Sequence, residues 1–169
     1  MTERGVTLLE LLVTLSIIMV LASVAMPLTK MTGKRTQELE LRQKLREMRM
    51  AVDEFRHDWA RDGEVLTGSL CVKNKLTCKA NTGVTGYPKS FKTLLGVELS
   101  GTEAATRETK AVRRYLRRIP VDPVTGAADW GLRCYQDPPD VQEWCNEDVF
   151  DVFSKSPEEA VDGTKYRDW

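Results

Sequence analysis

The hydrophobic and polar positions divide the N-terminal third of the chain into two parts of different character. Leu11 to Leu28 is a run of 18 residues without a charged side chain. Together with Val6 to Leu9 it is long enough to cross the hydrocarbon core of a bilayer. One acid, Glu10, lies inside this stretch, and ionisable groups at membrane depth usually have a partner and a task. The pattern therefore predicts a membrane-spanning helix with one functional carboxylate.

Beyond this run the pattern becomes that of an amphipathic helix. Apolar residues recur at steps of four and three, which places them on one helical stripe. The stripe is formed by Leu41, Leu45, Met48, Val52, Phe55 and Trp59. Asp62-Gly63 is typical of a helix end, so we expect one helix from Val6 to about Arg61, roughly 84 Å long. Three heptads are too few to favour a coiled coil, so the stripe is expected to dock against the chain's own head.

The middle of the chain is predicted to be a loop followed by helices. Asp62 to Ser90 is rich in Gly, Thr, Asn and Lys and is typical of a loop, and Phe91 to Leu95 of a short helical turn. Ser100 with Glu103 fits a capping box that opens a second helix, which Pro120 ends. The apolar face expected for this helix comprises Ala105, Val112, Tyr115, Leu116 and Ile119.

The last third of the chain is predicted to form short strands. Asp122 to Gly126 has the composition of a turn, and Asp162-Gly163 supplies another turn signal. Aromatic and apolar residues indicate strands near Trp130 to Tyr135 and Val149 to Phe153. The expected class is α+β, with a long helix, a second helix and a small antiparallel sheet.

Composition narrows the functional classes. Twenty-five basic and twenty-five acidic residues cancel, so no overall field attracts nucleic acid or an acidic substrate. One side of the expected second helix is basic, but such faces are usually solvated, and no nucleic acid is expected as a partner. His57 is the single histidine, and no nucleophile motif or P-loop occurs, so we expect no enzymatic activity and no required cofactor.

The four cysteines indicate disulfides. They have no Cys-x-x-Cys spacing and the chain has one histidine, so the sequence offers few suitable ligands for zinc. Short sequence separation favours the pairs Cys71–Cys78 and Cys134–Cys145 over the two other pairings, in an oxidising compartment. Free buried thiols are the alternative.

Three interpretations of the N-terminus were weighed. A secretory signal would be cut after the small residues Ser23 and Ala25, and an uncleaved anchor would not be cut at all. The third is a resemblance, carried by the stretch from Gly5 to Val13, GVTLLELLV. It resembles the class III signal of type IV pilins and type II secretion pseudopilins, in which a short leader ends in Gly and Thr-Leu-x-Glu begins an apolar helix. Glu10 then holds the fifth mature position and Pro27 the twenty-second, while Val6 stands where Phe is usual.

The resemblance implies a processing pathway and a topology. A membrane-embedded prepilin peptidase would cut after Gly5 and methylate the amine of Val6. Residues 1–5 would be the leader, 6–29 the membrane and filament-core helix, 30–61 its amphipathic continuation and 62–169 a periplasmic head. The chain would lie in the inner membrane with a cytoplasmic N-terminus, contact lipid before assembly, and then polymerise through its N-terminal helices, with Glu10 and Pro27 as assembly residues.

A second segment resembles a particular branch of this superfamily. Tyr115 to Pro123, YLRRIPVDP, resembles the Tyr-Leu-x-x-Leu-Pro-x-Asp-Pro segment of the major, G-type pseudopilins, and Asp151 to Ser154 and Trp169 resemble that group's last strand and ending. The resemblance implies a periplasmic filament for type II secretion, with an inner-membrane assembly platform and minor pseudopilins as partners. A surface type IV pilus and a membrane-tethered binding module that never polymerises are the alternatives.

The same resemblance raises the question of calcium. The G-type group holds a calcium ion in a loop near its C-terminus, and oxygen ligands of that kind suit the ion. Asp151, Asp162 and Asp168 are the available carboxylates, although Lys155 to Ala160 replaces the group's glycine-rich stretch. Calcium is therefore a candidate ligand rather than an expected cofactor.

Overall fold

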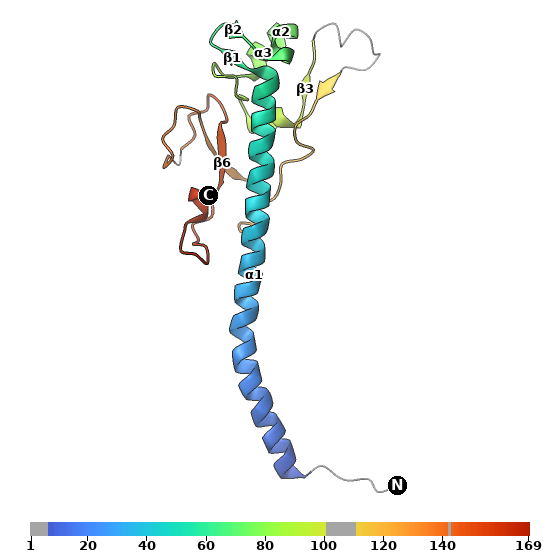
Figure 1. Cartoon of the computed structure of the whole chain (residues 1–169), viewed down its shortest axis with the longest axis vertical. Helices are drawn as coiled ribbons and strands as arrows, with labels where there is room; N and C mark the ends of the chain where they lie inside the picture. Colours follow the sequence, from blue (N-terminus) through green and yellow to red (C-terminus); the bar gives the residue numbers. More distant parts are fainter. Residues whose placement is uncertain (1–6, 101–110, 142) are drawn as a thin grey trace.

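The computed structural model describes residues 7–100, 111–141 and 143–169, and gives the backbone alone for residues 24–30. A single helix, α1 (Leu8–Trp59), runs the length of the molecule, and the head surrounds its C-terminal half (Figure 1). Its 52 residues extend about 78 Å. The predicted long helix is thus confirmed and continues through Pro27.

The apolar stripe on α1 is the centre of the core. All six predicted stripe residues are at most 2% exposed, and the residues that pack on them come from every later part of the head. Trp59 is fully buried, and at Ala60 the backbone turns to an extended conformation that ends the helix. Docking of the stripe against the chain's own head is therefore what the structure shows.

The segment predicted as a loop, residues 62–90, contains regular structure, so that prediction was wrong in part. A minimal hairpin of β1 (Arg61–Asp62) and β2 (Val65–Leu66) leads into α2 (Ser69–Lys73) and α3 (Lys75–Asn81). A disulfide and the buried Asn74 side chain, which bonds Leu70 O and the Ser100 N–H, hold the two short helices. Helices of five and seven residues are too short to show a 3.6-residue period in the sequence.

The second helix predicted from Ser100 to Ile119 is absent from its described part, residues 111–119. After η1 (Phe91–Leu95), which confirms the predicted helical turn, β3 (Val97–Glu98) pairs antiparallel with β4 (Val112–Arg113). The backbone N–H groups of Tyr115 and Leu116 both donate to Leu94 O. These hydrogen bonds hold the segment in an extended conformation. The apolar residues at 112, 115, 116 and 119 have the spacing of a helix, which explains the wrong prediction. Glu103 and Ala105 lie outside the described residues.

Both strands predicted near the C-terminus are confirmed. β5 (Trp130–Arg133) pairs antiparallel with β6 (Asp151–Ser154), in a register that sets Gly131 opposite Phe153. A Cβ on Gly131 would lie 2.2 Å from Phe153 Cζ, so the phenyl ring occupies the space that any side chain there would need. The chain ends in a 3₁₀ turn, η2 (Tyr166–Asp168). The class is α+β, although in the described ranges the predicted sheet is three separate two-stranded pairs.

Candidate assembly site

The N-terminal end of α1 is capped by Thr7. The Thr7 hydroxyl accepts a hydrogen bond from the Glu10 N–H at 3.3 Å, and Leu11 N–H donates to Thr7 O at 3.1 Å. Glu10 therefore lies in the first helical turn, where the helix dipole favours a negative charge. Gly5 and Val6, the predicted cleavage and methylation site, lie outside the described residues.

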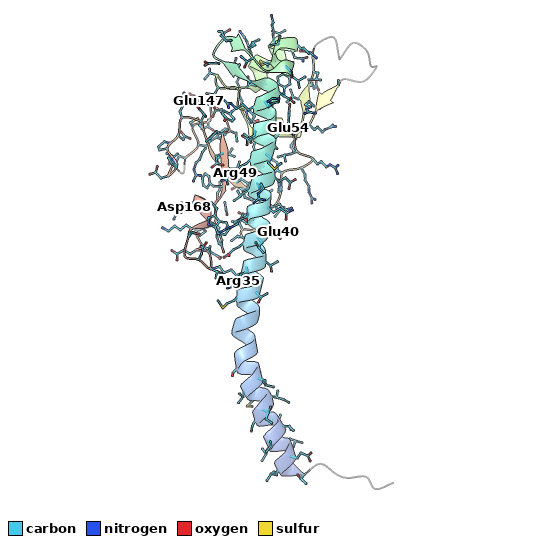
Figure 2. The ribbon with its side chains drawn as sticks, in the orientation of Figure 1. Arg35, Glu40, Arg49, Glu54, Glu147 and Asp168 are labelled. Carbon is cyan, nitrogen blue, oxygen red and sulfur yellow. A yellow bond between two sulfur atoms is a disulfide. The ribbon has the colours of Figure 1, made fainter. Side chains whose placement is uncertain are left out.

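The first half of α1 presents apolar side chains outward. Its large apolar side chains between Leu8 and Leu21 are between 46% and 79% exposed, and none of the head packs on them (Figure 2). The hydroxyls of Thr14, Ser16 and Ser23 all donate to carbonyls one turn earlier in the same helix. These groups therefore need no water, as an apolar environment requires.

Among the described residues, no helix combines the length and the apolarity needed to cross a membrane.

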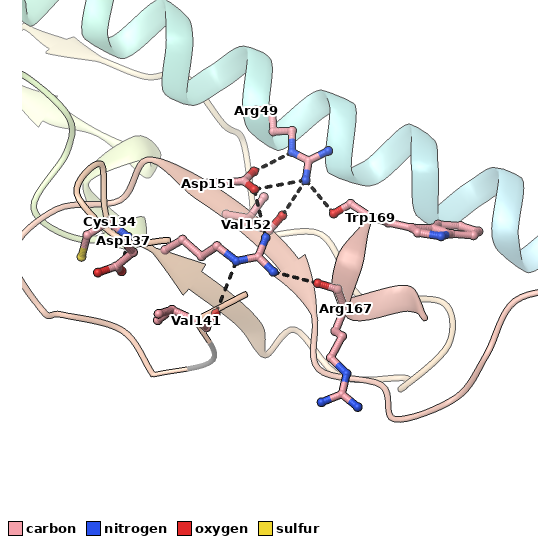
Figure 3. Close-up of polar contacts among 9 residues, drawn as sticks. Arg49, Cys134, Asp137, Val141, Asp151, Val152, Arg167 and Trp169 are labelled. Carbon is pink, nitrogen blue, oxygen red and sulfur yellow. Dashed lines mark hydrogen bonds and ion pairs between the residues drawn. The ribbon is translucent and has the colours of Figure 1, made fainter. Parts of the chain in front are cut away.

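The head is attached to α1 through Arg49 (Figure 3). Arg49 Nε donates to Asp151 Oδ1 at 2.6 Å, and its Nη2 donates to the main-chain oxygens of Val152 (3.2 Å) and Trp169 (2.7 Å). Arg133, on β5, holds the other oxygen of Asp151 at 3.3 Å and donates to Arg167 O at 2.9 Å. Asp151 and the two arginines together thus join the long helix, both strands of the last hairpin and the C-terminal turn.

The same contacts bear on calcium. Asp151 is held by two guanidinium groups, and Asp162 accepts from the Thr164 hydroxyl and backbone N–H and from Arg42. The Thr164 bonds, with help from Arg42, lower the pKa of the Asp162 carboxyl. Within the described residues, Asp151, Asp162 and Asp168 do not form a group able to share one ion. The three carboxylates therefore do not converge on one point, and calcium binding stays a prediction.

Both predicted disulfides are present, and the alternative of free thiols is wrong. Cys71 bonds Cys78 with Cα atoms 5.0 Å apart, and Cys134 bonds Cys145 with Cα atoms 6.1 Å apart. In the described part of the chain, the one close group of metal-ligating residue types is Cys134, Asp137 and Cys145. Because the two sulfurs are joined, they offer no thiolate to a metal.

Several structural residues were missed by the sequence reasoning. Arg49 directly follows Met48 of the buried stripe, and this border position was the available signal. Asp122 was assigned to a turn, but its buried carboxylate also accepts a hydrogen bond from Ser154 at 2.6 Å. Tyr115 donates to Asp58 and accepts from Trp59, and burial, with the Asp58 bond, raises the pKa of its hydroxyl. Nothing in the local sequence indicated the last two contacts.

The chain combines a long helix that has an exposed apolar half, a carboxylate in the first turn of that helix and an α+β head with two disulfides. Residues 1–26 match the family model described as the prokaryotic N-terminal methylation motif. This match supports a type IV pilin-like prepilin that prepilin peptidase processes and methylates. No curated protein and no solved structure gives a significant match to the chain.

Proposed function

We propose that this chain is a major pseudopilin-like subunit that polymerises into a periplasmic filament and drives type II protein secretion. Before assembly, the apolar part of α1 lies in the inner membrane with the head in the periplasm. After assembly, the same part forms the filament core against other copies. The role is structural, without a catalytic step.

The observation that carries this proposal is the exposed apolar half of α1. Burying one large aliphatic side chain contributes about 1.5–3 kcal/mol, so a helix that leaves a long series of them uncovered requires another apolar environment. The charge-free sequence from Leu11 to Leu28 supports lipid as the first environment. In the filament, the apolar environment is supplied by the same helix of other copies.

Glu10 supplies the register of assembly in this proposal. Cleavage after Gly5 leaves a charged amine on Val6, four residues before Glu10. In an apolar surrounding, attraction between opposite charges grows, although desolvation offsets much of that gain. The amine of an incoming subunit is neutralised by Glu10 of its neighbour, and this pairing selects one axial position.

The assignment to type II secretion is supported by the two segments that resemble G-type pseudopilins. Tyr115–Pro123 and Asp151–Ser154 are distant in sequence, yet Ser154 Oγ donates to Asp122 Oδ2 at 2.6 Å and both residues are buried. The two segments therefore form one structural unit of the head.

The test uses cells that depend on this chain for secretion, complemented with Glu10→Ala or Glu10→Gln. Both variants are expected to be inserted, cleaved and folded but to form no filaments and to support no secretion, and Gln separates charge from shape. Normal filaments and secretion from both, at wild-type protein levels, would contradict the pairing. Long surface fibres from the wild-type chain would favour a pilus over a pseudopilus, and cleavage without any polymer would favour the tethered module.

A further inference from the structure

The two flanks of the head carry opposite charges that the fold leaves unpaired. From residue 134 to residue 154 the sequence contains six acids and no Lys or Arg. From residue 113 to residue 118 it reads RRYLRR, with four arginines in six positions. The first segment includes the loop closed by Cys134–Cys145, and residues 115–118 of the second form part of one wall of a groove along α1.

Part of each set is already used within the subunit. Among the acids, Asp137, Asp148 and Asp151 accept hydrogen bonds from their own head, and Arg113 is paired with Glu54 and Asp58. The side chains of the rest are exposed and make no hydrogen bond or ion pair to the described residues. They are Asp140 and Glu143 on the loop with Glu147 just after it, and Arg117 and Arg118 on the groove wall with Arg114 just before it.

The two sets cannot meet within one subunit. The loop and Glu147 lie on one side of α1, whereas the segment that follows β4 lies on the other side (Figures 1 and 2). One flank has three unpaired carboxylates and the opposite flank has three unpaired guanidinium groups. The two flanks therefore suit a contact in which one flank of a subunit binds the opposite flank of the next identical subunit. Such a contact, repeated without closing, generates a filament.

The groove beside the arginines gives this contact a shape. It has a volume of about 970 Å³ and lies between α1 and residues 115–121, with Met50 and Ile119 as partly apolar walls. The bridged loop carries the exposed Pro138 and Pro139, which offer apolar contact area beside its charges. A disulfide-closed loop also loses less conformational freedom on binding than an open one.

Nucleic acid is a poorer occupant for the same groove. The carboxylates of Glu40, Glu47, Asp53 and Glu54 also line it, and they repel phosphates. A protein loop can instead bring apolar side chains to the α1 wall, where Met50 and Ala51 lie, and carboxylates to the arginine wall alone.

We propose that, in the filament, the acidic loop of one subunit binds the arginine-lined groove of the next copy of this chain. This inference rests on the proposed function, since it assumes that the chain polymerises. It adds a contact between heads to the contact between N-terminal helices, and it makes lateral assembly dependent on salt.

The experiment places a photo-crosslinking amino acid at position 118 of the full-length chain in membranes. Cross-links are expected to map to residues 137–148 of another copy. In that background, Arg114→Glu with Arg117→Glu, or Glu143→Lys with Glu147→Lys, should each reduce this product about tenfold, equivalent to about 1.4 kcal/mol. Co-expression of the two reversed chains should restore cross-linking between them. The matched control reverses two exposed lysines elsewhere, Lys75→Glu with Lys92→Glu, and should leave the amount of cross-linked product unchanged. Intact disulfides in every variant serve as the folding control.

The outcomes separate this inference from the proposed function. A wild-type chain that forms filaments while both reversed variants assemble and cross-link normally would overturn the inference alone. Cross-links that map outside residues 137–148 would also overturn the inference alone. So would a result in which the reversed arginine variant loses DNA binding but self-associates like the wild type. A wild-type chain that forms no polymer would overturn both.

Discussion

Arg49 provides the most quantitative prediction about the head. Its guanidinium makes four hydrogen bonds: two to Asp151, one to Val152 O and one to Trp169 O. Replacement by Ala removes all four at once and leaves the apolar stripe to hold α1 against the last hairpin and the C-terminal turn. The test compares the Arg49→Ala chain with the wild type.

The expected cost follows from burial. A hydrogen bond to a charged group contributes about 1.5–3 kcal/mol. The side chains of Arg49 and Asp151 are 38% and 22% exposed, so solvent screens part of this value. Arg133 still pairs with Asp151 after the change, which leaves no orphaned carboxylate. We therefore expect a loss of about 2–3 kcal/mol in the free energy of unfolding, or about 4–12 °C in Tm.

The assay is thermal and urea denaturation of the full-length chain in detergent, followed by circular dichroism. Arg49→Lys should lie between Ala and the wild type, because an ammonium group keeps the charge but loses the planar fork. Lys155→Ala is the matched control, since its ion pair with Asp129 is exposed and contributes at most about 1 kcal/mol. Equal stability of the Arg49→Ala and Lys155→Ala chains would refute the reasoning.

Three further predictions concern the head. Gly131→Ala should lower the free energy of unfolding by about 1–3 kcal/mol, because the new methyl group collides with the Phe153 ring; urea denaturation at wild-type stability would contradict this. Replacing Cys134 and Cys145 by Ser should cost about 3 kcal/mol for a separation of 11 residues, and an unchanged denaturation midpoint would count against it. Burial and the hydrogen bond to Glu38 raise the pKa of Tyr166 to about 12. The folded state therefore keeps a proton that the unfolded state loses above its ordinary value near 10, so stability should fall between about pH 10 and 12, and Tyr166→Phe should flatten that fall.

The elements that the sequence predicted well are those with a long or strictly alternating pattern. The stripe on α1 repeats over five steps, and all of its residues are buried. The strands β5 and β6 were bracketed by turn signals, and Gly126 and Gly163 adopt positive φ values in those turns. In these segments the local pattern and the tertiary packing favour the same structure.

The failures occur where contacts distant in sequence decide the backbone. The segment of Val112 to Ile119 has helical spacing, yet bonds to Leu94 and pairing with Val97 hold it extended. Asp151, one of the carboxylates named for calcium, is engaged by two arginines, one of them 102 residues away. Periodicity contains no information about such partners.

The central claim is that the chain is a prepilin-like subunit processed at its N-terminus. Mass spectrometry of the N-terminal peptide from native membranes tests it most directly. The account predicts a mature chain that begins at Val6 with a methylated amine. An intact leader, or a terminus near Met26 as a secretory signal would leave, would contradict it.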